Sequence, residues 1–221
     1  MVVAIDGPAG VGKSTVARRT ALAAGFLYIN SGSFYRAITL SVLQKGVPPR
    51  DEEQVLQASR TALLEISGGH IHLDGRDVEA QIHTDAVDRC VAVLSTIPAL
   101  RDVVNGRLRE LAAGRDAVVE GRDIGTVVFP HAEVKIFLDA DVATRASRRH
   151  EQGVSSLSRG EIEKTIQDRD AVDRNKPTGR LAAAPDALRI DTSLLTIEQV
   201  CERVRGAILA SKNNPGDIRR L

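Results

Sequence analysis

The chain has 221 residues, which is enough for one hydrophobic core with one or two inserted subdomains. Its apolar share of 43% and charged share of 27% are ordinary for a globular protein and exclude a disordered or fibrous chain. The 30 lysines and arginines nearly balance the 29 aspartates and glutamates, which argues against binding to nucleic acid or an anionic membrane through bulk charge.

Nothing in the sequence indicates export or a membrane span. The first residues lack a basic leader, and no apolar run reaches the roughly 18 residues that a span requires. The two cysteines, Cys90 and Cys201, both lie in apolar stretches with a helical pattern. We therefore expect a cytoplasmic protein with buried free thiols.

The first thirty residues predict a βαβ unit. An apolar run from Val2 to Ile5 is typical of a strand buried on both faces, and a second short apolar strand covers Phe26 to Ile29. Between them, a glycine-rich turn leads into a helix that begins at about Lys13 and ends before Gly25, a typical C-cap residue. Strand, helix and strand in this order predict a parallel, doubly wound sheet.

An insert with a different character follows. Helical patterns cover Ser33 to Gln44, Asp51 to about Leu64, Asp85 to Leu94, and Leu100 to Ala113. Asp51 with Gln54 resembles a capping box at the start of the second of these helices. The glycine-rich segment 65–82 alternates weakly, which predicts a hairpin or a three-stranded antiparallel patch.

The second half of the chain returns to alternating strands and helices. Strands are expected at Ala117–Glu120, Val134–Leu138 and Ala187–Ile190, and helices after Asp141, after Ser158, and from Thr196 to Lys212. Residues 152–157 form a polar break, and Ser158 with Glu161 forms a capping box. The tail from Asn213 is expected to fray.

The turn after the first strand carries a complete phosphate-binding motif. Gly7 to Ser14 matches G-x-x-x-x-G-K-[ST], in which backbone N–H groups and the end of the following helix face phosphate oxygens. Lys13 supplies a positive charge for the β- and γ-phosphates, and the Ser14 hydroxyl is a ligand for Mg²⁺. The predicted ATP-binding residues are Gly7, Pro8, Ala9, Gly10, Val11, Gly12, Lys13, Ser14 and Thr15.

This motif establishes nucleotide binding but leaves the reaction open. A GTPase switch should carry N-K-x-D to recognise guanine, and the segment Asn175–Thr178 lacks the aspartate. A transporter-type ATPase should carry L-S-G-G-Q before a strand, and Leu157–Glu161 matches it only in part, with no apolar strand after it. Phosphorylation of a small acceptor is therefore favoured.

A polar loop after the second predicted strand suits an anionic acceptor. The segment Ser31–Arg36 opens a helix at the carboxyl end of that strand, where parallel sheets bind their ligands. Its backbone amides, with Ser31, Tyr35 and Arg36, are suited to a monophosphate or its sugar. The alternative is a core role for Tyr35 and a solvated surface position for Arg36.

A second polar loop, Glu120–Thr126, directly follows the third strand. Arg122 and Asp123 therefore also project from the carboxyl end of the sheet, where they suit an acceptor with a phosphate and a hydrogen-bonding base. The alternative is an internal ion pair between these two residues that fixes the loop.

The charged segment 158–180 predicts a mobile lid. Between residues 141 and 180, nine lysines and arginines alternate with seven acidic residues, so the arginines can remain paired until phosphates arrive. A solvated helix would have a similar composition. Arg145 and Arg149 lie four residues apart on the preceding helix, where they either face ATP or form surface ion pairs.

With these motifs the chain resembles the bacterial cytidylate kinases, a family of nucleoside-monophosphate (NMP) kinases, over nearly its whole length. The motifs that carry the resemblance are Asp6-Gly7-Pro8, Asn30-Ser31-Gly32 with Tyr35-Arg36, Gly121–Thr126, Arg169-Asp170 with Asp173, and Asp191-Thr192. The resemblance implies a three-layer α/β P-loop NMP-kinase fold, with a five-stranded parallel sheet and helices on both faces. It implies one kinase domain with a core at 1–30, 101–151 and 179–221, an NMP-binding insert at 31–100, and a lid at 152–178.

The resemblance also implies roles for individual residues. Carried over by position, Ser31, Arg101, Arg122, Asp123 and Asp173 are expected to contact the acceptor, and Arg169 and Arg174 to neutralise phosphate charge from the lid. With the loop residues and Lys176, the predicted acceptor-binding residues are Ser31, Tyr35, Arg36, Arg101, Arg122, Asp123, Asp173 and Lys176. The predicted catalytic residues are Lys13, Arg122, Arg169 and Arg174.

Two positions depart from the family pattern. Lys176 stands where the family usually has an arginine three residues after the lid aspartate, and a lysine cannot form a bidentate fork. Ala92 stands where a serine is expected nine residues before Arg101, which removes one possible contact to the base.

We therefore predict that the chain uses ATP and Mg²⁺ to convert CMP and dCMP to CDP and dCDP by in-line phosphoryl transfer. Its partners would be these small substrates, with no nucleic acid and no membrane, and it would act as a monomer. One alternative is a kinase of the same fold for UMP, AMP or a non-nucleotide acceptor. The other is a nucleotide-gated binding module without catalytic activity.

Overall fold

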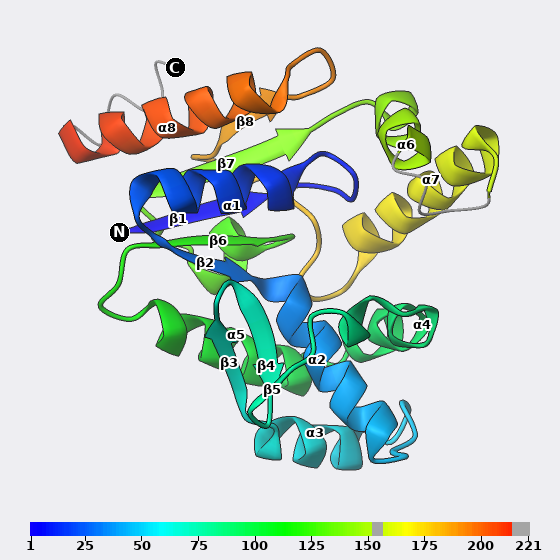
Figure 1. The fold of residues 1–221 in the computed structure, drawn as a ribbon. Helices are drawn as coiled ribbons and strands as arrows, with labels where there is room; N and C mark the ends of the chain where they lie inside the picture. Colours follow the sequence, from blue (N-terminus) through cyan, green and yellow to red (C-terminus); the bar gives the residue numbers. More distant parts are fainter. Residues whose placement is uncertain (152–156, 214–221) are drawn as a thin grey trace. The chain divides into compact units, whose positions relative to one another are not determined.

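The computed structural model describes residues 1–151 and 157–213 of the chain (Figure 1). The chain divides into two compact units, one formed by Met1–Tyr28 with the chain from Gly114 onward, and the other by Ile29–Ala113. The second unit includes residues 101–113, which the sequence analysis grouped with the core. Most of the expected polar break at 152–157, and the tail beyond Asn213, lie outside the described residues.

A five-stranded parallel sheet lies in the first unit, except for the last two residues of one edge strand, Ile29 and Asn30. Its strands are β1 (Val2–Asp6), β2 (Leu27–Asn30), β6 (Ala117–Gly121), β7 (Val134–Asp139) and β8 (Leu188–Asp191), in the order β2-β6-β1-β7-β8. The central strand β1 pairs with β6 and β7, so that Val3 lies opposite Val118 on one side and Val134 on the other. The expected α/β fold around such a sheet is confirmed.

One face of this sheet is covered by α1 (Lys13–Ala24) and α8 (Ile197–Asn213), which lie side by side (Figure 1). Their apolar side chains form one buried cluster with those of β1, β7 and β8. In β1, the side chains of Val3, Ala4 and Ile5 are all fully buried, which explains the continuous apolar run in the sequence. Burial of this apolar surface holds the two ends of the phosphate-binding motif in place.

Two further helices of the first unit, α6 (Val142–Glu151) and α7 (Arg159–Asn175), pack against each other (Figure 1). Ala146, Ile162 and Ile166 form a small apolar cluster of their own between these helices. The predicted capping box of Ser158 and Glu161 is present at the start of α7. The charged segment therefore forms a helix held by a narrow apolar stripe, with its other side chains available for polar contacts.

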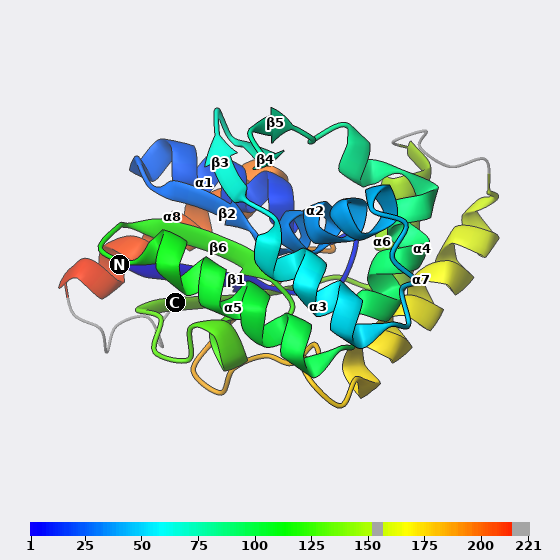
Figure 2. The same ribbon diagram turned by 90° about the horizontal axis from the view of Figure 1, so that it is seen from below.

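The second unit combines helices with a small antiparallel sheet. Its elements are α2 (Ser31–Gln44), α3 (Glu52–Thr61), β3 (Leu64–Ser67), β4 (His70–Leu73), β5 (Arg76–Asp77), a 3₁₀ turn (Gln81–His83), α4 (Asp85–Leu94) and α5 (Pro98–Ala112). The expected three-stranded antiparallel patch is confirmed, with the order β3-β4-β5. Helix α2 contacts α3, α4 and α5, and α3 lies beside α5 (Figure 2).

The helix expected to end near Leu64 is shorter than predicted. α3 ends at Thr61, because Leu64 begins β3 and pairs with Leu73 of β4. Asp51 does cap α3, since its carboxylate accepts the Gln54 backbone N–H at 3.1 Å. The Gln54 side-chain amide donates to the same carboxylate at 2.6 Å, which is a different contact from the second bond of a capping box.

Two glycine substitutions test how tightly the chain packs around Gly7, the first residue of the phosphate-binding motif. Gly25 ends α1 with φ of 69° and has open space around it, so Gly25→Ala should lower the free energy of unfolding by about 1 kcal/mol through backbone strain alone. Gly7 has φ of 152°, and a Cβ there would lie 2.2 Å from the Leu138 carbonyl oxygen. Gly7→Ala should therefore cost at least about 2 kcal/mol more. Urea unfolding of both variants measures the difference, and equal losses would contradict the packing around Gly7.

Candidate active site

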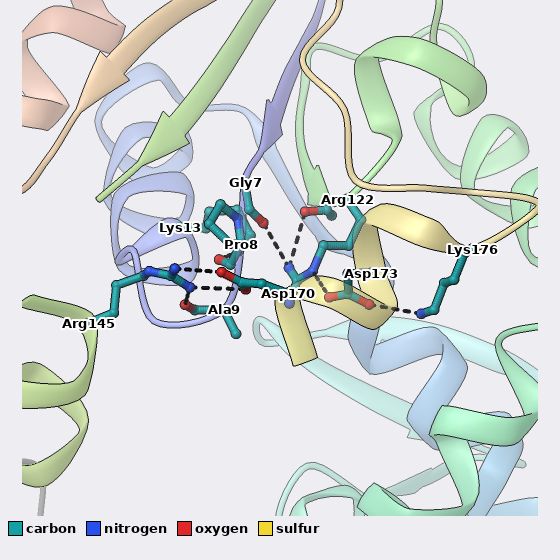
Figure 3. Close-up of polar contacts among 10 residues, drawn as sticks. Gly7, Pro8, Ala9, Lys13, Arg122, Arg145, Asp170, Asp173 and Lys176 are labelled. Carbon is teal, nitrogen blue, oxygen red and sulfur yellow. Dashed lines mark hydrogen bonds and ion pairs between the residues drawn. The ribbon is translucent and has the colours of Figure 1, made fainter. Parts of the chain in front are cut away.

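Three cations bind the carbonyl oxygens at the start of the phosphate loop, the segment Gly7–Ser14 between β1 and α1 (Figure 3). Arg122 Nη1 donates to the Gly7 carbonyl at 3.1 Å, Lys13 Nζ to that of Pro8 at 2.7 Å, and Arg145 Nη1 to that of Ala9 at 3.2 Å. The carbonyl and N–H of one trans peptide point in opposite directions.

The N–H groups of Ala9 and Gly10 belong to the peptides whose carbonyls are bound by Lys13 and Arg145. They therefore face away from these two cations, as a cradle for anionic phosphate oxygens requires.

Lys13 is buried at the centre of this arrangement, with only 6% of its surface exposed. Burial lowers the pKa of its ammonium group well below the usual value, and the positive charges of Arg122 and Arg169 lower it further. A phosphate anion would act in the opposite direction, because a nearby negative charge favours the charged form of a lysine. The site is thus electrostatically prepared for an anion.

Ser14 and Tyr28 both donate hydrogen bonds to the carboxylate of Glu120, the buried residue near the end of β6. The Ser14 Oγ lies 3.0 Å from Glu120 Oε2. The hydroxyl proton is thus directed at the carboxylate, which leaves the Ser14 oxygen lone pairs available to a cation.

Asp6 joins the phosphate loop to the Glu120–Thr126 loop. Its two carboxylate oxygens accept the backbone N–H groups of Ile124 at 2.8 Å and of Gly125 at 2.7 Å. Burial raises the pKa of Asp6 to about 6, although both backbone hydrogen bonds oppose this shift. Asp6 was part of the family motif in the sequence, but no pattern indicated this contact, which spans more than one hundred residues.

Arg122 pairs with an aspartate of the predicted lid. Its Nε donates to Asp173 at 3.0 Å, and Lys176 donates to the other oxygen of Asp173 at 2.9 Å (Figure 3). Burial acts to raise the pKa of Asp173, but the charges of Arg122 and Lys176 hold it below its usual value. Arg122 of the Glu120–Thr126 loop therefore forms its ion pair with Asp173 of α7. Asp123 is also buried, at 5% exposure.

Arg145 is the most deeply buried arginine of the site, and it forms a bidentate pair with Asp170 of α7 at 3.0 and 2.5 Å (Figure 3). Its Nε also donates to the Ala140 carbonyl at 3.1 Å. Arg149, which was expected to face ATP together with Arg145 or to form a surface ion pair, is exposed at the surface of α6. Asp170 was not among the predicted site residues, because its pairing with Arg145 depends on how α6 and α7 pack.

The remaining lid residues of the prediction, Arg169 and Arg174, are exposed on α7. Arg169 is close enough for its charge to affect Lys13. The Asp191-Thr192 motif lies on the other side of the loop, where Thr192 Oγ1 donates to the Val11 carbonyl at 3.4 Å.

The predicted acceptor residues Ser31, Tyr35, Arg36 and Arg101 all belong to the second unit. Arg36 is paired with Asp88 of α4 at 2.9 Å, and the guanidinium of Arg101 lies over the Tyr35 ring at 5.7 Å from its centre. Ser31 and Arg101 are buried. Asp88 is a further residue that the sequence did not indicate, and the roles of the four predicted residues remain predictions.

A parallel α/β sheet with this loop at the carboxyl end of its central strand defines a P-loop nucleotide-binding protein. The family model described as cytidylate kinase matches residues 3–209 of the chain. A cytidylate kinase of Caldanaerobacter subterraneus subsp. tengcongensis is 42% identical over 219 residues, with 98% of this chain and 97% of the relative covered. One of Mycolicibacterium paratuberculosis is 43% identical, with 94% and 95% covered. The chain belongs to the cytidylate kinase family, and it is a phosphotransferase.

A solved structure of an uncharacterized protein from Eubacterium ventriosum is similar with a TM-score of 0.51, covering 95% of this chain and 99% of that chain. At 11% identity this similarity concerns the fold alone. Among the described residues, no helix has the length and apolar character needed to cross a membrane.

The raised pKa of Asp6 predicts a pH-dependent stability. Because the pKa is about 6 in the folded chain and 3.8 for the unperturbed group, the unfolded chain ionises first as the pH rises. Relative to Asp6→Asn, which cannot ionise, the wild type should lose about 2 kcal/mol of unfolding free energy between about pH 4 and pH 6.5. Urea unfolding of both proteins at the two pH values measures this loss. A stability difference that does not change with pH would contradict the buried, destabilised carboxylate.

Proposed function

We propose that the chain transfers the γ-phosphoryl group of ATP to CMP and dCMP, with Mg²⁺ bound at the phosphate loop. The observation that carries this proposal is the arrangement of the loop in the first unit, where bound carbonyls orient the Ala9 and Gly10 amides beside the buried Lys13. Membership of the cytidylate kinase family supports CMP as the acceptor. We further propose that the protein acts as a cytoplasmic monomer on small substrates.

The donor set fits Mg²⁺ held together with the phosphates of ATP. Among residues 1–151 and 157–213, no group of three or more histidine, cysteine, aspartate or glutamate side chains could hold a metal ion alone. Mg²⁺ usually takes few protein ligands and completes its shell with water and substrate phosphates. Ser14 would supply such a ligand, and Glu120 would orient it through their hydrogen bond. When bound, the ion would neutralise charge on the phosphates.

We assign ATP binding to Gly7–Thr15, and we propose acceptor-binding residues in each unit. Those of the second unit are Ser31, Tyr35, Arg36 and Arg101, and those of the first are Arg122, Asp123, Asp173 and Lys176. The buried Asp123 and Asp173 offer carboxylates to the hydrogen-bond donors of a sugar or base.

Catalysis would depend on position and charge. The acceptor phosphate is already ionised at neutral pH, so no strong general base is required. Lys13 and Arg122 would share the negative charge that develops during transfer, with Arg169 and Arg174 added from α7. Lys13 is buried and hydrogen-bonded to the Pro8 carbonyl, and a charge held in this way needs little reorganisation during the reaction.

The acceptor preference depends on two positions that differ from the family pattern. Lys176 binds Asp173 through a single Nζ, whereas an arginine would offer a fork of donors. Ala92 offers no hydroxyl to a base. With these two residues, fewer contacts distinguish one base from another than in the usual family pattern. The alternative to test is therefore a kinase of the same fold that prefers another monophosphate, such as UMP or AMP.

An acceptor panel tests the proposed reaction. We expect kcat/KM for CMP and dCMP to exceed that for UMP and AMP by at least about fivefold, because a base that leaves one buried polar group unpaired loses roughly 1 kcal/mol or more. A coupled ADP-release assay measures each acceptor at the same ATP and Mg²⁺ concentrations. A best acceptor other than CMP or dCMP would exclude the cytidine preference. ATP binding without turnover on any monophosphate would favour a binding module.

Two single variants separate the donor from the acceptor assignment. Lys13→Ala should lower kcat by about 10³-fold for every acceptor, because the charge next to the transferred group is lost. Asp123→Ala should instead raise the KM for CMP by about tenfold and leave the KM for ATP within about twofold. Steady-state kinetics with each substrate varied in turn distinguishes these patterns. Unchanged CMP kinetics in both variants would mean that the site has been assigned to the wrong residues.

A further inference from the structure

Helix α7 reaches the phosphate loop through two aspartates that lie three residues apart. Asp173 binds Arg122, which also binds the Gly7 carbonyl, and Asp170 binds Arg145, which also binds the Ala9 carbonyl (Figure 3). Each aspartate therefore acts on the loop through an arginine. Asp173 is among the predicted acceptor-binding residues, whereas Asp170 has no assigned role.

The Asp170 contact is the more buried and the more restrictive of the two. The two aspartates are similarly buried, at 11% exposure for Asp170 and 8% for Asp173, but Arg145 is 2% exposed against 24% for Arg122. Arg145 donates to both oxygens of Asp170, to the Ala9 carbonyl and to the Ala140 carbonyl. With four hydrogen bonds to three different groups, this guanidinium has little freedom to rotate.

The Arg145 contact fixes one particular peptide of the loop. Because the peptide between Ala9 and Gly10 is planar and trans, a hydrogen bond at the Ala9 carbonyl also sets the direction of the Gly10 N–H. That N–H is one of the groups that the loop presents to phosphate. An arginine without its carboxylate would be free to leave the carbonyl.

We propose that Asp170 is a positioning residue for the phosphate donor: it holds Arg145 against the Ala9 carbonyl and so orients the Gly10 amide for the phosphates of ATP. The inference rests on the proposed function only in taking ATP as the donor. Asp170 itself touches no substrate and acts through Arg145.

If the Arg145–Asp170 pair had only a structural role, its replacement would have a different effect on ATP binding. Replacement of a buried ion pair by apolar residues of similar size is often neutral or stabilising, whereas removal of one partner is strongly destabilising. If the pair only stabilised the packing of α6 and α7, a matched apolar pair would therefore restore the protein completely. If it positions the loop, stability would return without ATP affinity.

The test compares Asp170→Asn, the double variant Arg145→Met with Asp170→Leu, and the control Asp168→Asn. Asp168 is an exposed residue of the same helix, so its variant should bind ATP within about twofold of wild type. In calorimetric titrations without acceptor, Asp170→Asn and the double variant should each raise the Kd for ATP at least about tenfold, within the usual range of coupling between sites. The double variant should keep the wild-type unfolding midpoint, and the Kd for CMP should stay within about twofold in all variants.

A double variant that binds ATP like wild type would overturn the proposal, as would an equal loss of ATP and CMP affinity. A double variant that no longer unfolds cooperatively would assign the pair to folding and would also overturn it. Because the titrations require no turnover, an absence of CMP phosphorylation would contradict the proposed function and leave this test unaffected.

Discussion

The binding of three successive carbonyls by Arg122, Lys13 and Arg145 is the constraint on which the site depends. A glycine-rich loop has many accessible conformations, and most of them do not present several N–H groups to one anion. Cations at the carbonyls select a conformation with the Ala9 and Gly10 amides directed away from them. Asp6 holds the adjoining Glu120–Thr126 loop, and Asp170 holds Arg145 at its carbonyl.

The three cations concentrate positive charge beside the phosphate loop, and nearby carboxylates of the first unit neutralise part of it. Asp170 and Asp173 neutralise two arginines, while Lys13 is left with a pKa well below its usual value because burial and Arg122 oppose its charge. The negative charge of a bound polyphosphate would favour the charged form of Lys13 and so raise its pKa again. This interaction with Lys13 would thus contribute to nucleotide affinity.

The sequence predicted what depends on short stretches of chain. The phosphate motif, the βαβ unit, the Ser158 capping box and the antiparallel patch follow from local patterns, and all four are present. The pairs Arg122–Asp173 and Arg145–Asp170 join residues far apart in sequence, so their partners could only be found from the packed structure. Helix α3 was predicted too long because strand pairing competes with helical propensity after Thr61, which no local pattern reveals.

We expect the three cations at the carbonyls to be sufficient to orient the Ala9 and Gly10 amides. A titration of the ¹⁵N-labelled protein with inorganic triphosphate, followed by NMR without acceptor or metal, tests it most directly. We expect the amide protons of Ala9 and Gly10 to move downfield as they bind phosphate oxygens, while the amides of β1 and of the middle of α1 stay unchanged. Rearrangement of the signals throughout β1 and α1, or no response at Ala9 and Gly10, would contradict a preformed cradle.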